Sequence, residues 1–291
     1  MIKPPADEAR LDELRHEVAS LRRRGHHVRA RLTFERGDAR RFARGAARAR
    51  YDVVAAVGGD GTINEVVNGL VAAPWQPRLG ILPFGTANDF ATGLGIPPSP
   101  AEALDVTVRG RVVAADVGVV NERCFINVST GGFGAAAAER VPVGWKRLLG
   151  RFAYLITGAR SLVHWESGHA RFLAEGRLIH DGPFAFFAVG NAWRTGGGTR
   201  VTPRAEFGDG RLDVTVVRGV SRLDFLALLP DLRAGTHLES PHVLYLRTER
   251  FEVLAAAPLG VNADGEPLSG ARFTYRLLPR ALRLMVPREE G

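Results

Sequence analysis

In the first 110 positions, segments whose apolar residues recur with helical spacing alternate with short apolar runs that are typical of strands. Leucines and valines between Leu11 and Leu21 recur every three or four residues, which predicts an amphipathic helix over residues 8–24. The short apolar run at 52–57 predicts a strand buried on both faces of a sheet. The same criteria predict further helices over 38–50 and 62–70 and further strands over 28–32 and 78–82. Helices that alternate with strands favour a doubly wound, mostly parallel α/β sheet.

The pattern changes after about residue 112, where short alternating runs separated by turn residues replace the helices. They predict strands over 114–120, 124–128, 170–174, 184–189, 212–217, 242–247, 251–254, 272–277 and 281–286. The one long helical pattern in this half covers 145–163. We therefore expect a second, antiparallel β domain with a helical insertion, beginning near residue 122.

Length and composition agree with two globular domains. The chain has 291 residues, of which 45% are hydrophobic and 24% charged, and its one cysteine, Cys124, excludes an internal disulfide and a cysteine-based zinc site. No apolar stretch reaches the roughly 18 residues of a membrane span, and the first 15 residues do not resemble a secretory signal. We therefore expect a cytoplasmic protein.

The charge is unusual in amount and in kind. The formal net charge is +8, only Lys3 and Lys146 are lysines, and residues 1–50 contain 14 basic and seven acidic side chains. The arginine excess fits either codon bias or an anionic partner, meaning a nucleotide, a membrane surface or a nucleic acid. The Walker A, protein kinase, G-x-S-x-G and H-E-x-x-H motifs are all absent, which excludes the enzyme classes that depend on them.

Two segments place glycines and polar residues after predicted strands. The segment 57–65 reads VGGDGTINE, and glycines before a helix start allow close backbone approach, positive φ angles and an anion at the helix N-terminus. The segment 80–90 repeats the design and presents Thr86 and Asn88. Because consecutive parallel strands end at the same sheet edge, we expect the two segments to lie close together. Capped structural turns are the alternative interpretation of both.

A third polar segment, at 261–267, places Asp264 and Glu266 on either side of a glycine. Phosphoryl transfer needs a base for the acceptor hydroxyl and acidic groups for Mg²⁺, so this carboxylate pair is a candidate catalytic element. An ordinary hairpin turn explains the same residues.

Taken together, the motifs resemble a known family. In chain order they are GGDGTINEVVNGL, GILPFGTANDFATGLGIP, FINVSTGGFG and VNADGEPLSG. This series is similar to the bacterial diacylglycerol kinase catalytic-domain family, and within it to the YegS-like lipid kinases, over about residues 11–287. The resemblance implies an ATP-binding α/β domain like those of NAD kinases and phosphofructokinases, at 1–122 with 278–291 returning to it. It also implies a β-sandwich-like lipid-substrate domain at 123–277.

The resemblance also implies roles for individual residues. ATP contacts are implied for Thr33, Gly58, Gly59, Asp60, Gly61, Thr62, Ile63, Asn64 and Thr86, with Asp60 helping to hold Mg²⁺–ATP. Asp264 and Glu266 are the implied catalytic pair, with Glu266 as the proton acceptor. A structural Mg²⁺ site, or Ca²⁺ in its place, is implied at Glu206, Asp209 and Arg211. The family usually has an additional apolar strand before the first helix. We expect such a strand to be encoded upstream of Met1, and a sheet edge that is completed differently is the alternative.

The resemblance indicates an ATP-dependent lipid kinase that phosphorylates a membrane glycerolipid, phosphatidylglycerol first and diacylglycerol second. We expect it to work at the inner face of the membrane as a peripheral protein, without nucleic acid and with a homodimer as one possible state. An NAD kinase-like enzyme and a non-catalytic protein that binds nucleotide or an anionic surface are the alternatives.

Overall fold

The computed structural model describes residues 8–132, 168–193 and 195–288, and of Arg222 only the backbone. The chain forms two compact units, residues 1–115 with 280–291 and residues 116–279. It passes into the second unit within β3 (Arg111–Val120) and returns within β11 (Glu266–Val286). The predicted two-domain α/β fold class is confirmed, whereas the helix predicted over 145–163 lies outside the described residues.

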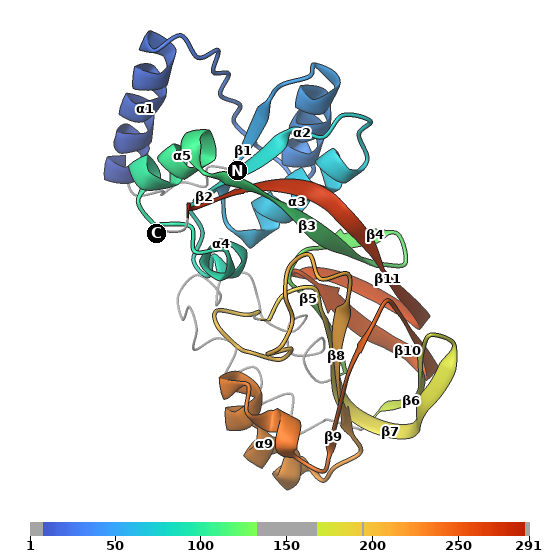
Figure 1. The fold of residues 1–291 in the computed structure, drawn as a ribbon. Helices are drawn as coiled ribbons and strands as arrows, with labels where there is room; N and C mark the ends of the chain where they lie inside the picture. The colour runs from blue at the N-terminus through green and yellow to red at the C-terminus, as the bar shows by residue number, and fades with distance from the viewer. Residues whose placement is uncertain (1–7, 133–167, 194, 289–291) are drawn as a thin grey trace. The chain divides into compact units, whose positions relative to one another are not determined.

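The first unit is built on a parallel sheet with helices on both sides. β1 (Val53–Gly58) pairs with β2 (Arg78–Pro83), and the end of β11 pairs with the other edge of β2. Figure 1 shows α1 and α5 on one side of these strands and α2 and α3 on the other. The helices of this unit are α1 (Glu8–Arg23), α2 (Asp38–Arg48), α3 (Asp60–Val71), α4 (Asp89–Gly93) and α5 (Pro100–Arg109).

Small residues bring these helices close to one another and to the sheet. α2 buries Ala39, Ala43 and Ala47. A Cβ atom on Gly69 of α3 would lie 3.0 Å from the Ala43 side chain, and one on Gly80 of β2 would lie 2.5 Å from the Thr107 hydroxyl of α5. Since such distances leave no room for a methyl group, these glycines set the spacing of the layers.

The strand predicted over 28–32 is wrong. Residues 26–34 form no helix or strand, and the Leu32 side chain is 55% exposed. An alternating pattern becomes a strand only when a neighbouring strand accepts its hydrogen bonds. Among the described residues, β1 lies at the end of the sheet and pairs with β2 alone, so residues 28–32 have no partner there. β1 is also less buried than its apolar sequence predicts.

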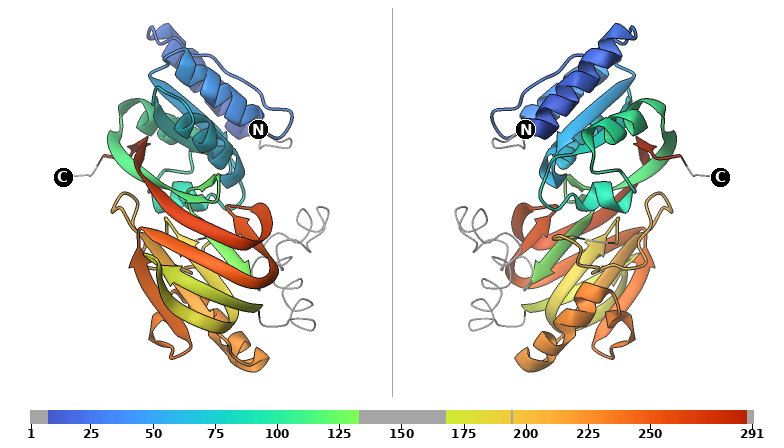
Figure 2. Two further views of the ribbon diagram at one scale, coloured as in Figure 1. Left: turned by 90° about the vertical axis from the view of Figure 1, so that its right-hand side faces the viewer. Right: turned by 90° about the vertical axis from the view of Figure 1, so that its left-hand side faces the viewer.

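The second unit is an antiparallel β structure in which two short strands share one position. β5 (Val128–Gly132) and β6 (Gly168–Ala174) both pair with β7 (Arg177–Gly190) on one side and with β10 (Arg250–Ala263) on the other. The yellow β6–β7 hairpin and the orange β10 can be followed in Figure 2. The remaining elements are β4 (Arg123–Phe125), β8 (Leu212–Arg218), α9 (Arg222–Ala234), η1 (His237–Glu239) and β9 (Val243–Thr248).

Alternation along β7 and β8 gives this sheet two apolar faces. Phe187 and Val216 belong to a core with the aromatic residues of β6, β10 and β11. Their neighbours Phe186 and Val217 point into a second core, which α9 closes with Phe225 and two leucines. The strands predicted separately over 272–277 and 281–286 form a single strand, β11, which contributes to both units.

Candidate functional site

Two loops lie side by side at the carboxyl ends of β1 and β2. In the parallel register Gly58 faces Pro83, and the N–H of Phe84 donates a 3.0 Å hydrogen bond to the carbonyl of Gly58. The chain then enters α3 at Asp60 and α4 at Asp89. The structure therefore brings together the two polar segments of the first unit, as the order of strands predicts.

Glycines in these loops allow close packing of the protein against itself. A Cβ atom on Gly59 would lie 3.0 Å from the Cα of Gly85, and one on Gly85 would lie 2.7 Å from Asn88 Oδ1. A Cβ atom on Gly58 would lie 2.5 Å from the Thr62 hydroxyl. None of these glycines has a positive φ, so the left-handed conformation allowed for in the sequence analysis is not the reason for them.

Gly61 differs from its neighbours because nothing in the protein requires a glycine there. A Cβ atom would meet no atom within 4 Å, the φ angle is not positive, and the residue is exposed. It lies in the first turn of α3, whose N-cap residue Gly59 provides no side-chain cap. An uncapped helix N-terminus offers N–H groups and a positive dipole end, which together suit a phosphate.

Asp60 links the two loops. Its Oδ2 accepts a hydrogen bond from the N–H of Asp89 at 3.1 Å, and its Oδ1 accepts one from the N–H of Phe90 at 2.9 Å. Asn88, in the left-handed region at φ 51°, fixes the second loop through hydrogen bonds to the backbone of Gly85. A carboxylate has about four acceptor positions, so Asp60 keeps capacity for a metal–nucleotide complex beside these two bonds.

The other predicted nucleotide-binding residues have varied surroundings. Thr86 is exposed and Thr62 is partly exposed, so both can meet a ligand. The side chains of Ile63 and Asn64 are buried in α3, where Asn64 accepts a hydrogen bond from Asn68. Thr33 lies in the irregular segment after α1, and its hydroxyl oxygen is buried without a hydrogen-bond partner among the described residues.

In the second unit, Asp264 and Gly265 form the turn between β10 and β11. Both have positive φ, 48° and 89°, as a type I′ hairpin turn requires. The Asp264 carboxylate accepts hydrogen bonds from three successive N–H groups, those of Ile126 at 2.5 Å, Asn127 at 3.0 Å and Val128 at 3.1 Å. These bonds fix the carboxylate against the β4–β5 connection.

The carboxylate of Glu266 pairs with an arginine side chain. Its Oε2 lies 3.1 Å from Nη1 of Arg123, and the side chain is about a quarter exposed. Arg123 is at the start of β4, so the pair spans two strands that are far apart in the sequence. Of the two predicted catalytic carboxylates, Asp264 is thus held by backbone N–H groups in the turn, and Glu266 directly follows that turn with a side chain that is about a quarter exposed.

Buried polar residues that the sequence analysis missed surround this turn. The amide nitrogen of Asn191 donates to the carbonyls of Asp116 and Ile126, both at 3.0 Å, and the side chain of Asn191 is almost fully buried. Asn127 Oδ1 is buried without a hydrogen-bond partner among the described residues. The signal that was available is an Asn directly beside an apolar strand, since Asn191 follows β7 and Asn127 directly precedes β5.

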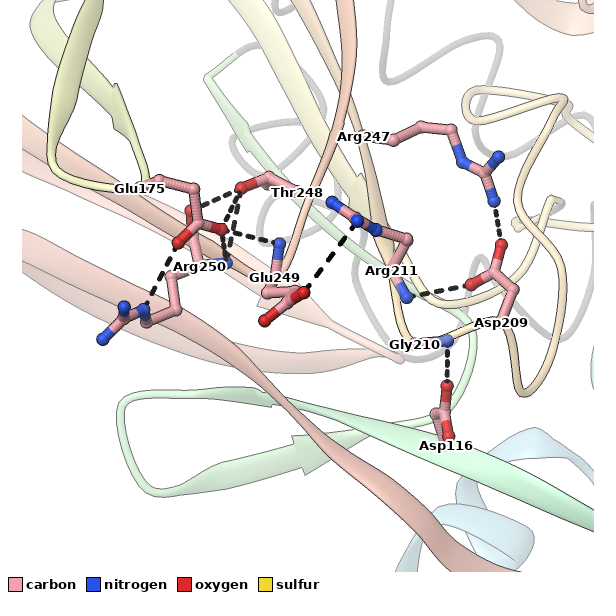
Figure 3. A network of polar contacts seen from close by, with 9 residues as sticks. All are labelled: Asp116, Glu175, Asp209, Gly210, Arg211, Arg247, Thr248, Glu249 and Arg250. Atoms are coloured by element: carbon pink, nitrogen blue, oxygen red, sulfur yellow. Dashed lines mark hydrogen bonds and ion pairs between the residues drawn. The ribbon is translucent and has the colours of Figure 1, made fainter.

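Two members of the set implied to hold a structural metal, Asp209 and Arg211, already have protein partners (Figure 3). Asp209 Oδ1 accepts the N–H of Arg211 at 2.9 Å, and Asp209 Oδ2 accepts from the guanidinium of Arg247. No group of three His, Cys, Asp or Glu side chains converges on a metal-sized site in the described part of the chain. With the Arg247 guanidinium on the Asp209 carboxylate, this set does not fit a resident divalent cation as it stands.

Arg247 also belongs to a buried network. Its Nε lies 3.6 Å from Oδ2 of Asp213, whose Oδ1 accepts a 2.5 Å hydrogen bond from the Tyr245 hydroxyl. Burial raises the pKa of Asp213, against the opposing effects of the Tyr245 hydrogen bond and the Arg247 charge. Burial, together with the Asp213 hydrogen bond, also raises the pKa of Tyr245, which keeps this hydroxyl a donor.

No helix among the described residues combines the length and the apolarity needed to cross a bilayer.

Comparison with protein families gives two matches that together cover nearly the whole chain. The family described as "Diacylglycerol kinase catalytic domain" matches residues 4–120, and "YegS C-terminal NAD kinase beta sandwich-like domain" matches residues 127–286. The first match contains both glycine loops, and the second contains Asp264 and Glu266.

Curated relatives match at similar length. A "Probable lipid kinase YegS-like" of Chromohalobacter salexigens is 39% identical over 283 residues, which cover 96% of this chain and 90% of that protein. A "Probable lipid kinase YegS" of Shigella flexneri is 37% identical over 277 residues, 94% of this chain and 91% of that protein.

Solved structures share the fold. A diacylglycerol kinase from Bacillus anthracis superposes with a TM-score of 0.74 at 21% identity, covering 96% of this chain and 91% of that one. An NAD kinase from Archaeoglobus fulgidus, in complex with ATP, superposes with a TM-score of 0.55 at 13% identity, covering 95% and 90%.

Proposed function

Since this chain belongs to the YegS-like lipid kinases of the diacylglycerol kinase catalytic-domain family, we propose that its acceptor is a hydroxyl of phosphatidylglycerol and its donor Mg²⁺–ATP. Diacylglycerol is the second candidate acceptor. The preference for phosphatidylglycerol is supported by the similarity of the four motifs to the YegS-like branch. The reaction occurs at the inner face of the membrane, which the basic residues 1–50 help the protein to approach.

The observation that carries the nucleotide site is Gly61 on an uncapped helix. The protein itself explains Gly58, Gly59 and Gly85 by close packing, but it does not explain Gly61. A ligand that passes over the first turn of α3 does explain it, because a side chain there would block its approach. The α3 N–H groups receive the phosphates, and Thr62 and Thr86 are the hydroxyls placed to add contacts.

Glu266 is the proposed proton acceptor. In phosphoryl transfer the protein mainly positions the reactants, and a base accepts the proton of the acceptor hydroxyl. The Glu266 side chain is about a quarter exposed, and Arg123 restricts its orientation. Asp264 serves as a positioning residue, since its three backbone hydrogen bonds hold the turn that carries Glu266.

The nucleotide site is tested by substituting Gly61. Gly61→Leu adds a side chain where the fold has open space, so the melting temperature should be unchanged or slightly raised while ATP affinity falls at least tenfold. Gly59→Val is the contrast, because its Cβ would lie 3.0 Å from Gly85 Cα and it should lower stability as well as binding. Unchanged ATP affinity in a folded Gly61→Leu protein would contradict the proposal.

The acceptor is tested with radiolabelled ATP and a panel of phosphatidylglycerol, diacylglycerol and NAD. We expect the label in phosphatidylglycerol. Transfer to diacylglycerol alone would replace the proposed head group, and transfer to NAD would favour the NAD kinase-like alternative. An active-site variant, Glu266→Gln, is the control for contaminating kinases, and absence of transfer to any acceptor would favour a non-catalytic protein.

A further inference from the structure

A line of arginines occupies the outward face of α2, and none of them is among the residues proposed above to bind nucleotide. Arg40, Arg44 and Arg48 are spaced four residues apart and are exposed. With Arg41, Gly37 and Gly45 they line a groove of about 470 Å³, and no acidic side chain contributes to it. We call this the α2 groove; its helix is labelled in Figure 1.

Among the residues that the structure describes, only one of the four arginines of the α2 groove has an acidic partner. Arg41 pairs with Asp38 at 2.7 Å, and the second oxygen of Asp38 accepts the N–H groups of Phe34 and Glu35. The side chains of Arg40, Arg44 and Arg48 take part in no hydrogen bond or ion pair with any residue that the structure describes. Like charges four residues apart destabilise a helix, so these three arginines lower the stability of α2.

Gly45 is the second, independent observation. It lies in the interior of α2 with a φ that is not positive, and a Cβ atom there would meet nothing within 4 Å. Neither backbone conformation nor packing requires a glycine, and glycine is among the poorest helix formers. Glycine leaves the space between the arginine side chains open, and the side chain of any other residue would fill part of it.

Arginine forks match the oxygen geometry of phosphate, and the volume of the groove is within the range of small-molecule sites. We propose that the α2 groove binds a phosphate group, carried either by an anionic lipid head group or by a soluble phosphate ester. This site is additional to the proposed transfer reaction and does not depend on which lipid is phosphorylated.

The test uses the full chain with two probes and no ATP. Inorganic phosphate is titrated by calorimetry, and sedimentation is measured with vesicles of phosphatidylglycerol and phosphatidylcholine and with vesicles of phosphatidylcholine alone. Arg40→Gln, Arg44→Gln and Arg48→Gln together should raise the dissociation constant for the bound probe at least tenfold. The matched control, Arg23→Gln, Arg24→Gln and Arg31→Gln together, removes the same charge from residues 1–50 and should change it less than threefold.

A third variant tests the shape of the groove without changing its charge. Gly45→Leu changes no charge, so it should weaken binding of the same probe while raising the melting temperature through its better helix propensity. A loss confined to anionic vesicles identifies the lipid head group, and a loss confined to inorganic phosphate identifies a soluble ester; either outcome supports the site. An equal loss of affinity in the groove triple variant and in the control triple variant would overturn the proposal, because binding would then depend on the overall positive charge and not on the groove. Binding of neither probe would also overturn it.

Discussion

Asp264 and Glu266 are two positions apart in the sequence, and the structure gives them different surroundings. Asp264 accepts three N–H groups and Glu266 faces an arginine and solvent. At the scale of single residues, we therefore expect Asp264 to hold the turn and Glu266 to meet the substrate.

Substitution of each carboxylate by its amide distinguishes these roles. Glu266→Gln should lower kcat by about 10²–10⁴-fold, the usual contribution of a positioned base, with unchanged melting temperature and ATP affinity. Asp264→Asn replaces one acceptor oxygen by a donor that faces backbone N–H groups, so it should lower the melting temperature as well as activity. Kinetics with radiolabelled ATP and thermal unfolding measure the two effects; an undiminished melting temperature for Asp264→Asn would contradict the positioning role.

At the scale of elements, Glu175 joins the β6–β7 turn to the connection between β9 and β10 (Figure 3). Its Oε1 accepts from the Thr248 hydroxyl at 2.8 Å and from the N–H groups of Glu249 and Arg250, both at 2.9 Å. The Thr248 hydrogen bond, followed by that of the Arg250 N–H, lowers the pKa of Glu175 to about 2.

This lowered pKa predicts a pH dependence of stability. Because the pKa is below its usual value of 4.5, the contribution of Glu175 is complete above about pH 4.5 and is lost as the pH falls toward 2. Glu175→Gln should therefore lower the melting temperature at pH 7, and the difference from the wild type should shrink between pH 4.5 and 2. A constant difference over that range would mean that ionised Glu175 does not hold the two turns together.

The contacts of Arg247 lead to a prediction of how the second unit responds to metal ions. Its guanidinium satisfies Asp209 and lies beside Asp213, and Glu206 adds to the negative potential there. EDTA should leave the wild-type melting temperature unchanged. Arg247→Gln removes the cation from these carboxylates, so its melting temperature should fall and should recover when Mg²⁺ or Ca²⁺ is added. A wild-type melting temperature that falls in EDTA would instead favour the resident metal that the family resemblance implies.

At the scale of the whole molecule, β11 makes the two ends of the chain interdependent. Its last residues complete the sheet of the first unit, where Leu284 is fully buried opposite Leu79 of β2. Leu284→Ala should destabilise the protein by about 2–5 kcal/mol in urea unfolding. Leu178→Ala, at a half-exposed position in β7, is the matched control and should cost less than about 0.5 kcal/mol. Equal costs would show that the returning strand does not support the first unit.

Local pattern was sufficient for much of the fold. The spacing of leucines predicted α1, and apolar runs followed by glycines predicted β1, α3 and β2 together with the edge at which their loops meet. These features depend on side-chain periodicity and on turn chemistry within about ten residues, which is information that the sequence contains directly.

Tertiary structure decided what depends on distant partners. Residues 28–32 alternate like a strand, yet no strand in the described part of the chain pairs with them. Asp60 and Asp264 are polar turn residues in the sequence, but their N–H donors lie 29 or 30 and 136 to 138 positions away, so only the folded chain shows that they hold turns together. The ion pair between Arg247 and Asp209 was not predicted for the same reason, because the two residues are 38 positions apart and nothing local in the sequence indicates that they meet. The sequence by itself thus determined the elements and the candidate chemistry, and the packing of remote segments determined which partners each carboxylate contacts.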